Sequence, residues 1–157
     1  MTFPFQFPET FPAAVLLDEG PQDIEVILIT WLTPLRRTAV TRRSGDELPF
    51  TLVKHIAGSE DVDDSTADWE ASVHTLCDRA AGEAAAALEA DKTHRRILYL
   101  ARTLPAFTLP DGTGVGLDYV EVTESPRWEP YGDDQILRKI GRYQFGLTYS
   151  PSPDTGS

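Results

Sequence analysis

Hydrophobic and polar residues alternate along two stretches of the chain, residues 68–74 and residues 142–149. The apolar positions of the first are Trp69, Ala71 and Val73, and those of the second are Tyr143, Phe145, Leu147 and Tyr149. Successive side chains of a strand point to opposite faces of its sheet. Each stretch therefore predicts a strand of a sheet with one buried and one solvent-facing side.

Three further strands are predicted from β-favouring residues that lie between turn signals. They cover residues 36–43, 50–57 and 115–122. The turn Ser44-Gly45-Asp46 follows the first of them, and Asp111–Gly114 precedes the last. Residues 58–65 are strongly acidic and predict an exposed loop, and Pro126, Pro130 and Gly132 predict another.

Apolar residues at helical spacing predict two helices, over residues 21–35 and residues 77–102. The first is apolar nearly all round, which is typical of a helix in a core or between subunits. Its run Val26–Ile29 also fits a strand. The second is rich in alanine and ends before Pro105; its predicted inward stripe is Ala81, Ala85, Leu88, Ile97, Leu98 and Ala101. Together these elements predict a single α+β domain over residues 21–150.

The two ends of the chain differ from this domain. Residues 1–20 are predicted to form an extended arm, because Pro4, Pro8 and Pro12 recur every four residues and block helix and central strand. The aromatic residues between the prolines, Phe3, Phe5, Phe7 and Phe11, favour burial against this protein's own body or a neighbouring chain. A terminus without fixed contacts is the alternative. Residues 151–157 are predicted to be a disordered C-terminal tail.

Length and composition narrow the class of protein. A chain of 157 residues fits one domain, and such a domain buries enough surface to fold without a metal or a disulfide. No stretch is long and apolar enough to span a membrane, and the N-terminus lacks the pattern of a signal peptide. The single cysteine, Cys77, excludes an internal disulfide and fits a reducing compartment, so we expect synthesis in the cytoplasm.

The net charge of −11 argues against a general nucleic-acid binder, which needs a clustered basic surface. It is compatible with a passage through which DNA slides without sticking, because an acidic wall repels phosphate. The acidic loop supplies four candidate residues for such a wall or for a contact between subunits: Glu60, Asp61, Asp63 and Asp64. A loop that is merely solvated is the alternative.

Four arginines within eight residues are the second notable charge feature: Arg36, Arg37, Arg42 and Arg43. They fit an edge strand that charge protects from pairing, a nucleic-acid contact, or a contact with an acidic partner surface. The acidic loop of the next identical subunit is one such surface. With Phe3, Phe5 and Phe7, these arginines are the candidate subunit or partner interface.

The sequence predicts no catalytic residue, no metal site and no cofactor. His74 and Cys77 are three residues apart, but a zinc site needs three or four convergent ligands and a nucleophilic pair needs an orienting group. Gly112, Gly114 and Gly116 precede a strand and do not fit a phosphate-binding loop. Two alternatives remain: a monomeric adaptor domain, or a small hydrolase or transferase that uses His74 or His55 and has a deep pocket with a perturbed histidine.

Two segments carry a resemblance to a known family. One is the strand Leu48-Pro49-Phe50-Thr51-Leu52-Val53 with the acidic loop after it, and the other is Ser125-Pro126-Arg127-Trp128-Glu129-Pro130-Tyr131 before the last strand. With the order of the elements around them, these segments resemble the tail terminator proteins of long-tailed bacteriophages, also described as minor tail or head–tail joining proteins. The resemblance covers residues 21–150.

The resemblance implies a mixed, mainly antiparallel sheet of four to five strands packed against two helices. It also implies a hexameric ring that caps the tail tube, stops its polymerisation and presents a surface to the head-completion, or stopper, protein. The implied partners are five further copies of the chain, the major tail tube protein and the stopper protein, with DNA passing through the ring without specific binding. The implied location is the head–tail junction of the virion; another neck or connector protein is the alternative within this class.

Overall fold

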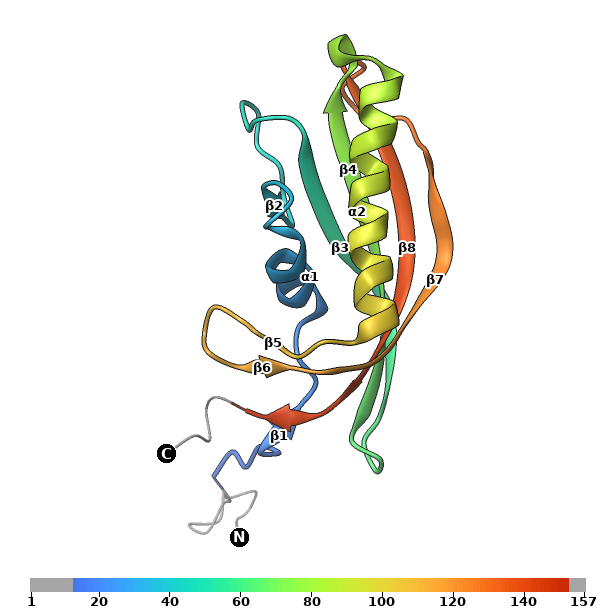
Figure 1. Cartoon of the computed structure of the whole chain (residues 1–157). Coiled ribbons are helices and arrows are strands. Elements are labelled where there is room, and N and C mark those ends of the chain that lie inside the picture. Colours follow the sequence, from blue (N-terminus) through green and yellow to red (C-terminus); the bar gives the residue numbers. More distant parts are fainter. Residues whose placement is uncertain (1–12, 153–157) are drawn as a thin grey trace, which may run out of the picture.

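The structure is a computed structural model that describes residues 13–152, and its centre is a five-stranded sheet (Figure 1). The strand order is β2-β3-β4-β8-β7. β2 pairs with β3 in parallel and the other neighbours are antiparallel. The strands are β2 (Thr38–Ala39), β3 (Phe50–Asp61), β4 (Thr66–Asp78), β7 (Leu117–Trp128) and β8 (Ile136–Thr148). The predicted α+β class, with a mixed and mainly antiparallel sheet, is confirmed.

Both helices, α1 (Ile24–Leu32) and α2 (Glu83–Thr103), cover the same face of this sheet. Asp23 caps the start of α1, and its carboxylate accepts a hydrogen bond from the Glu25 amide. The main core lies between the helices and the sheet; it includes Ile27, Leu28 and Leu32 of α1, Ile97 and Leu100 of α2, and Val53, Val73, Tyr143 and Phe145 of the strands. The inward residues predicted for the last strand are confirmed, since Tyr143, Phe145 and Leu147 are at most 1% exposed.

The other face of the sheet has a second, smaller core at one end. Phe50, Leu52, Leu76 and Ile136 form it, and Leu48 and Tyr131 from two loops cover it. Ser72, His74 and Ile140, which follow Leu76 and Ile136 on the same face, are also at most 8% exposed. The sheet is therefore buried on both sides from the start of β3 to the middle of β4 and β8.

Short strands close one end of the molecule. β1 (Glu19–Gly20) pairs with β9 (Ser150–Pro151), and β5 (Phe107–Thr108) pairs with β6 (Gly114–Val115). Pro151 and Ser152 are thus part of the fold, although the sequence placed them in the tail; the Ser152 amide donates to the Asp18 carbonyl. The candidate interface residues Phe3, Phe5 and Phe7 lie outside the described residues.

The predicted acidic loop is wrong in its extent. β3 continues to Asp61 and β4 begins at Thr66, so a long hairpin replaces the loop and only residues 62–65 form its turn. The strands extend because each residue from Gly58 to Asp61 has a partner on β4. Gly58 to Asp64 are nevertheless exposed, as expected.

Three other boundaries also differ from the prediction. Cys77 lies in β4 opposite Leu137 of β8, so the strand continues where a helix was predicted. Only two residues of the predicted strand 36–43, Thr38 and Ala39, are β-structure. The predicted loop around Pro126 is the end of β7; proline fits there because β7 is an edge strand whose register shifts between Glu124 and Arg127.

The inward stripe of α2 also differs from the prediction. Its buried residues are Ala86, Ala90, Thr93, Ile97 and Leu100. Leu88 is 53% exposed and Leu98 is 38% exposed, although both were placed in the stripe. The helix begins at Glu83, six residues after the predicted start.

Candidate assembly surfaces

Arg36 is the one member of the arginine cluster whose guanidinium is turned inward, with 5% of its side chain exposed. It forms an ion pair of 3.0 Å with Glu89 of α2 and donates to the Thr51 hydroxyl of β3 at 3.0 Å. It also donates to the Thr93 hydroxyl and the Glu89 carbonyl of α2. These contacts hold the segment after α1 to both the sheet and α2, so Arg36 has a structural role.

The other three arginines surround Asp46 in the loop before β3. The Arg37 guanidinium lies 3.4 Å from the Asp46 carboxylate, the Arg43 amide donates to that carboxylate, and Arg42 donates to the Asp46 carbonyl. Arg37 and Arg43 are exposed, and Arg42 is half-buried. Arg37 and Arg43 are therefore the members of the cluster that remain on the surface.

The four candidate acidic residues all lie at the tip of the β3–β4 hairpin. Glu60 accepts a hydrogen bond of 2.6 Å from the Tyr149 hydroxyl, and this bond raises the pKa of Tyr149 to about 12. Asp61 accepts from the Asp64 amide and closes the turn. Glu60 and Asp61 thus stabilise the hairpin, while the carboxylates of Asp63 and Asp64 are exposed without a partner among the described residues.

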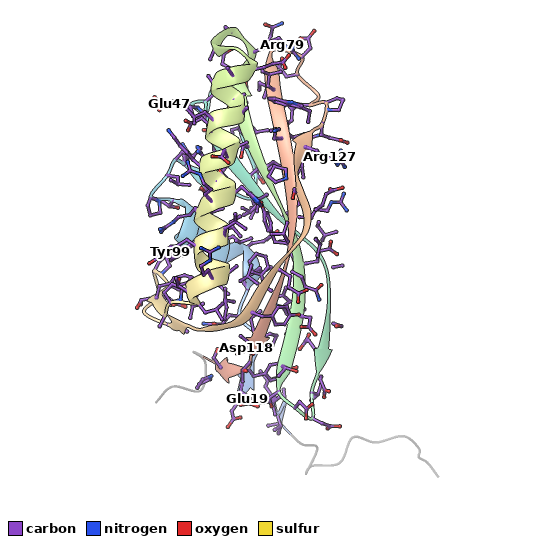
Figure 2. All side chains as sticks on the ribbon, turned by 45° about the vertical axis from the view of Figure 1, so that its right-hand side comes forward. Glu19, Glu47, Arg79, Tyr99, Asp118 and Arg127 are labelled. Carbon is purple, nitrogen blue, oxygen red and sulfur yellow. The ribbon has the colours of Figure 1, made fainter. Side chains whose placement is uncertain are left out.

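This hairpin tip belongs to a larger acidic end of the molecule, which we call the acidic end. Hydrogen bonds join its segments: Ser65 donates to Glu19, Thr148 to Asp118, Tyr119 to Asp68 and the Tyr149 amide to the Ser65 carbonyl. Figure 2 shows Glu19 and Asp118 at the same end of the molecule, far from Arg79. The segments of the acidic end are residues 13–23, 57–70, 105–121 and 144–152.

Charge is strongly separated between this end and the rest of the molecule. The four segments contain twelve acidic residues and no lysine or arginine. The other described residues contain eleven acidic and fourteen basic side chains. The acidic end therefore has a formal charge of −12, and the remainder of the described chain is slightly positive.

The two segments that carry the family resemblance meet in the smaller core. Leu48, Phe50 and Leu52 come from the first segment, and Tyr131 of the second packs against them. The Arg138 guanidinium lies over the Tyr131 ring at 5.3 Å, and Lys139 lies over the Trp128 ring at 4.9 Å. These segments thus have a packing role at the end opposite the acidic end.

One of the two histidines that the enzyme alternative would use is His74, which is 8% exposed and lies between Ser72 and Arg138. Burial and then the positive charge of Arg138 lower the pKa of His74 to about 4, so the ring is neutral. Because a guanidinium only donates, Nδ1 of His74 accepts from Arg138 and Nε2 carries the hydrogen. His74 then donates to the Ser72 hydroxyl at 2.9 Å and is not placed to remove its proton.

The other two residues considered for chemistry are Cys77 and His55. Cys77 is 4% exposed, and burial raises the pKa of its thiol to about 11. His55, the second histidine of the enzyme alternative, is exposed on β3, and its ring contacts the Ala57 carbonyl at 3.0 Å. Two surface pockets, one beside β1 and β9 and one beside Trp128 and Tyr131, contain no histidine.

Within residues 13–152, no three histidine, cysteine or carboxylate side chains are grouped so that they could hold a metal ion. None of the described helices is long and apolar enough to cross a membrane. The chain matches no known protein-family model, and comparison with curated proteins finds no significant match.

Proposed function

We propose that the chain is a structural protein of a phage virion that forms a ring at the head-proximal end of the tail. In this role it stops polymerisation of the tail tube and joins the tail to the head-completion proteins. The ring has six copies, contacts the major tail tube protein and the stopper protein, and lets DNA pass without specific binding. It has no catalytic activity and needs no cofactor.

The observation that carries this proposal is the separation of charge between the acidic end and the rest of the molecule. A ring that turns its acidic ends toward a common axis gives a channel wall that repels phosphate. Six copies would carry about −66 in total, six times the −11 of one chain. The α+β fold and the resemblance of residues 21–150 to tail terminators support the same role, and the tautomer of His74 disfavours the hydrolase alternative.

Removal of the gene from a phage that encodes this chain tests the proposal. We expect overlong tail tubes and separate heads filled with DNA, because tube growth has no stop and the joint is missing. Supplying the chain from a plasmid should restore tails of normal length, and electron microscopy of the joint should show one ring of six copies. Tails of normal length joined to heads without the chain would contradict the proposal.

A second test concerns the acidic hairpin, whose residues Glu60, Asp61, Asp63 and Asp64 face the channel or the neighbouring ring in this proposal. The variant Asp63→Asn/Asp64→Asn removes two charges that have no internal partner. We expect fewer particles that join tails or deliver DNA. The matched control is Glu47→Gln/Asp134→Asn, which removes two exposed charges outside the acidic end. If both variants yield as many particles that join tails and deliver DNA as the natural chain does, the hairpin charges have no such role.

A further inference from the structure

The two edges of the five-stranded sheet differ in how their backbone groups are occupied. At the β3 edge, β2 pairs with Thr51 and Leu52, the His55 amide donates to the Glu25 carboxylate at 2.9 Å, and the His55 ring contacts the Ala57 carbonyl at 3.0 Å. At the β7 edge, no described residue forms a hydrogen bond to the outward backbone groups of residues 117–128. Figure 1 shows β7 at the margin of the sheet, on the side away from α1.

Only the first part of β7 is regular enough to accept another strand. Residues 119–122 pair with consecutive residues 146–143 of β8, whereas the register shifts before Tyr119 and again after Val122. Pro126 lacks an amide hydrogen in the later part. Shifts and a proline of this kind hinder the addition of a strand, so the open stretch centres on residues 119–123.

Apolar side chains accompany this open stretch on the face that carries the helices. Val122, which is 38% exposed, is opposite Tyr143, and the Tyr143 hydroxyl contacts His94 of α2. Leu98, also 38% exposed, is one turn after His94 on the same side of α2. Val120 is half-buried against the main core. An added strand with apolar side chains on this face would cover both Val122 and Leu98.

The N-terminal arm has the sequence of such a strand. In an extended chain, the amide and carbonyl groups of alternate residues point to the same edge, and their side chains point to the same face. Pro4, Pro8 and Pro12 all occupy even positions, so every missing amide hydrogen falls on one edge. The odd positions keep all their amide hydrogens, and they include Phe3, Phe5, Phe7 and Phe11.

A strand built from these residues has one edge able to pair and one edge that ends the sheet. Its pairing edge offers an uninterrupted set of donors and acceptors, and its phenylalanine rings share one face. Its other edge lacks donors at the prolines, so no further strand adds to it. Residues 3–8 carry no charged side chain, so this part of the strand approaches Asp118 and Glu121 of β7 without repulsion. Glu9 follows it and is the one charged side chain among residues 1–12.

We propose that residues 3–11 of one copy add as a strand to the outer edge of β7 in a neighbouring copy, with the phenylalanine rings over Val122 and Leu98. The neighbour is the occupant because the chain leads away from its own body before the arm begins. Val15 is 85% exposed, Leu16 is 75% exposed and Leu17 is 59% exposed. This mode is β-augmentation, in which backbone hydrogen bonds give affinity and side chains give register. The inference rests on the proposed ring and names the contact that holds its copies together.

Disulfide trapping between two separately purified variants tests this contact. Phe5→Cys protein is mixed in concentrated solution with Val122→Cys protein that carries a size tag, and the mixture is oxidised. We expect a cross-linked product of unique size, several-fold more abundant than in the control mixture with Ile56→Cys. Ile56 is 43% exposed and lies at the β3 edge, so the control cysteine is as accessible. Cys77 stays in place because it is buried and its raised pKa keeps the thiol protonated.

Three outcomes overturn the inference. They are equal cross-linking at both edges, no cross-linking at Val122, and closure within one chain when Phe5→Cys and Val122→Cys are combined. As an independent readout, Phe3→Ser/Phe5→Ser/Phe7→Ser should reduce the mass of the assembly in sedimentation without changing the unfolding of the monomer. An unchanged assembly mass would also overturn it.

Cross-linking and imaging of the tail end together distinguish a failure of this inference from a failure of the proposed function. Rings at the tail end that show no cross-link at Val122 would overturn the arm contact and leave the ring role intact. Cross-linked copies that never form a ring at the tail end would overturn the ring role and leave the arm contact intact.

Discussion

At the scale of single residues, three strand glycines are covered by aromatic rings. Trp69 of β4 lies over Gly58 of β3, Tyr119 of β7 lies over Gly146 of β8, and Tyr143 lies over Gly141 within β8. A Cβ at any of these glycines would overlap the ring above it. Trp69 has little freedom to move away, because its indole nitrogen donates to the Gln22 carbonyl at 3.0 Å and its ring meets His55. The absence of a side chain at Gly58 is therefore a packing requirement.

Gly58→Ala should destabilise the fold by about 1–3 kcal/mol, because the new methyl group forces the Trp69 ring out of place. Gly116→Ala is the control, since nothing lies within 4 Å of a Cβ at that position. Chemical denaturation of both variants measures the difference. A Gly58→Ala protein as stable as Gly116→Ala would show that the Trp69 ring moves at little cost.

His74 should make the fold less stable in acid. The unfolded chain has a histidine pKa of 6.5, and in the folded protein burial and Arg138, Lys54 and Arg142 lower it to about 4. Protonation therefore favours the unfolded chain, so the contribution of neutral His74 is complete above pH 6.5 and is lost as the pH falls toward 4. The loss is at most about 3 kcal/mol.

The variant His74→Gln removes this titration. Its free energy of unfolding should fall less between pH 6.5 and pH 4 than that of the natural chain. His94, whose pKa burial also lowers, is present in both proteins and cancels in the comparison. Equal pH profiles would rule out His74 as the source of the acid sensitivity.

At the scale of elements, the sequence predicted which segments form strands and helices better than it predicted where they end. The alternation around Trp69 and Tyr143 predicted the faces of two strands because side-chain direction depends only on the local backbone. The end of β4 depends on β8, which pairs with it as far as Asp78, and no local pattern contains that partner. The same holds for Arg36, which looked like part of a surface cluster but reaches across to α2.

Arg36→Leu should destabilise the protein by about 2–3 kcal/mol, because it removes the ion pair with Glu89 and the hydrogen bonds to Thr51 and Thr93. Lys92 remains beside the Glu89 carboxylate at 3.1 Å. Arg37→Leu is the matched control; its side chain is 65% exposed and its ion pair with Asp46 is 3.4 Å long. Such a pair contributes less than about 1 kcal/mol. Thermal or chemical unfolding compares them. Similar losses for the two variants would show that Arg36 does not hold α1, β3 and α2 together.

At the scale of the whole molecule, the net charge could be read from the sequence, but the distribution of charge could not. Residues 18–23, 60–70, 111–121 and the C-terminal strand are far apart in the chain, and only the fold gathers them at one end. Twelve carboxylates on one side with no lysine or arginine among them repel one another. The fold must hold these charges together against their repulsion.

Added salt should therefore raise the melting temperature of the isolated chain, because it screens repulsion between exposed charges. The increase should be smaller in Asp63→Asn/Asp64→Asn, from which two of these charges are missing. Glu47→Gln/Asp134→Asn should respond like the natural chain. Differential scanning fluorimetry at several salt concentrations measures these responses. A melting temperature that falls with salt would mean that attraction elsewhere outweighs the repulsion at the acidic end.

The pairing of β1 with β9 has a practical consequence for imaging. Because Glu19–Gly20 lies against Ser150–Pro151, the polypeptide enters and leaves the folded body at one place. A fluorescent or electron-dense label fused to the C-terminus would mark that place without touching the far end of β7. In the proposed ring, the position of the extra density would report directly whether the acidic end points toward the capsid, the tube or the central axis.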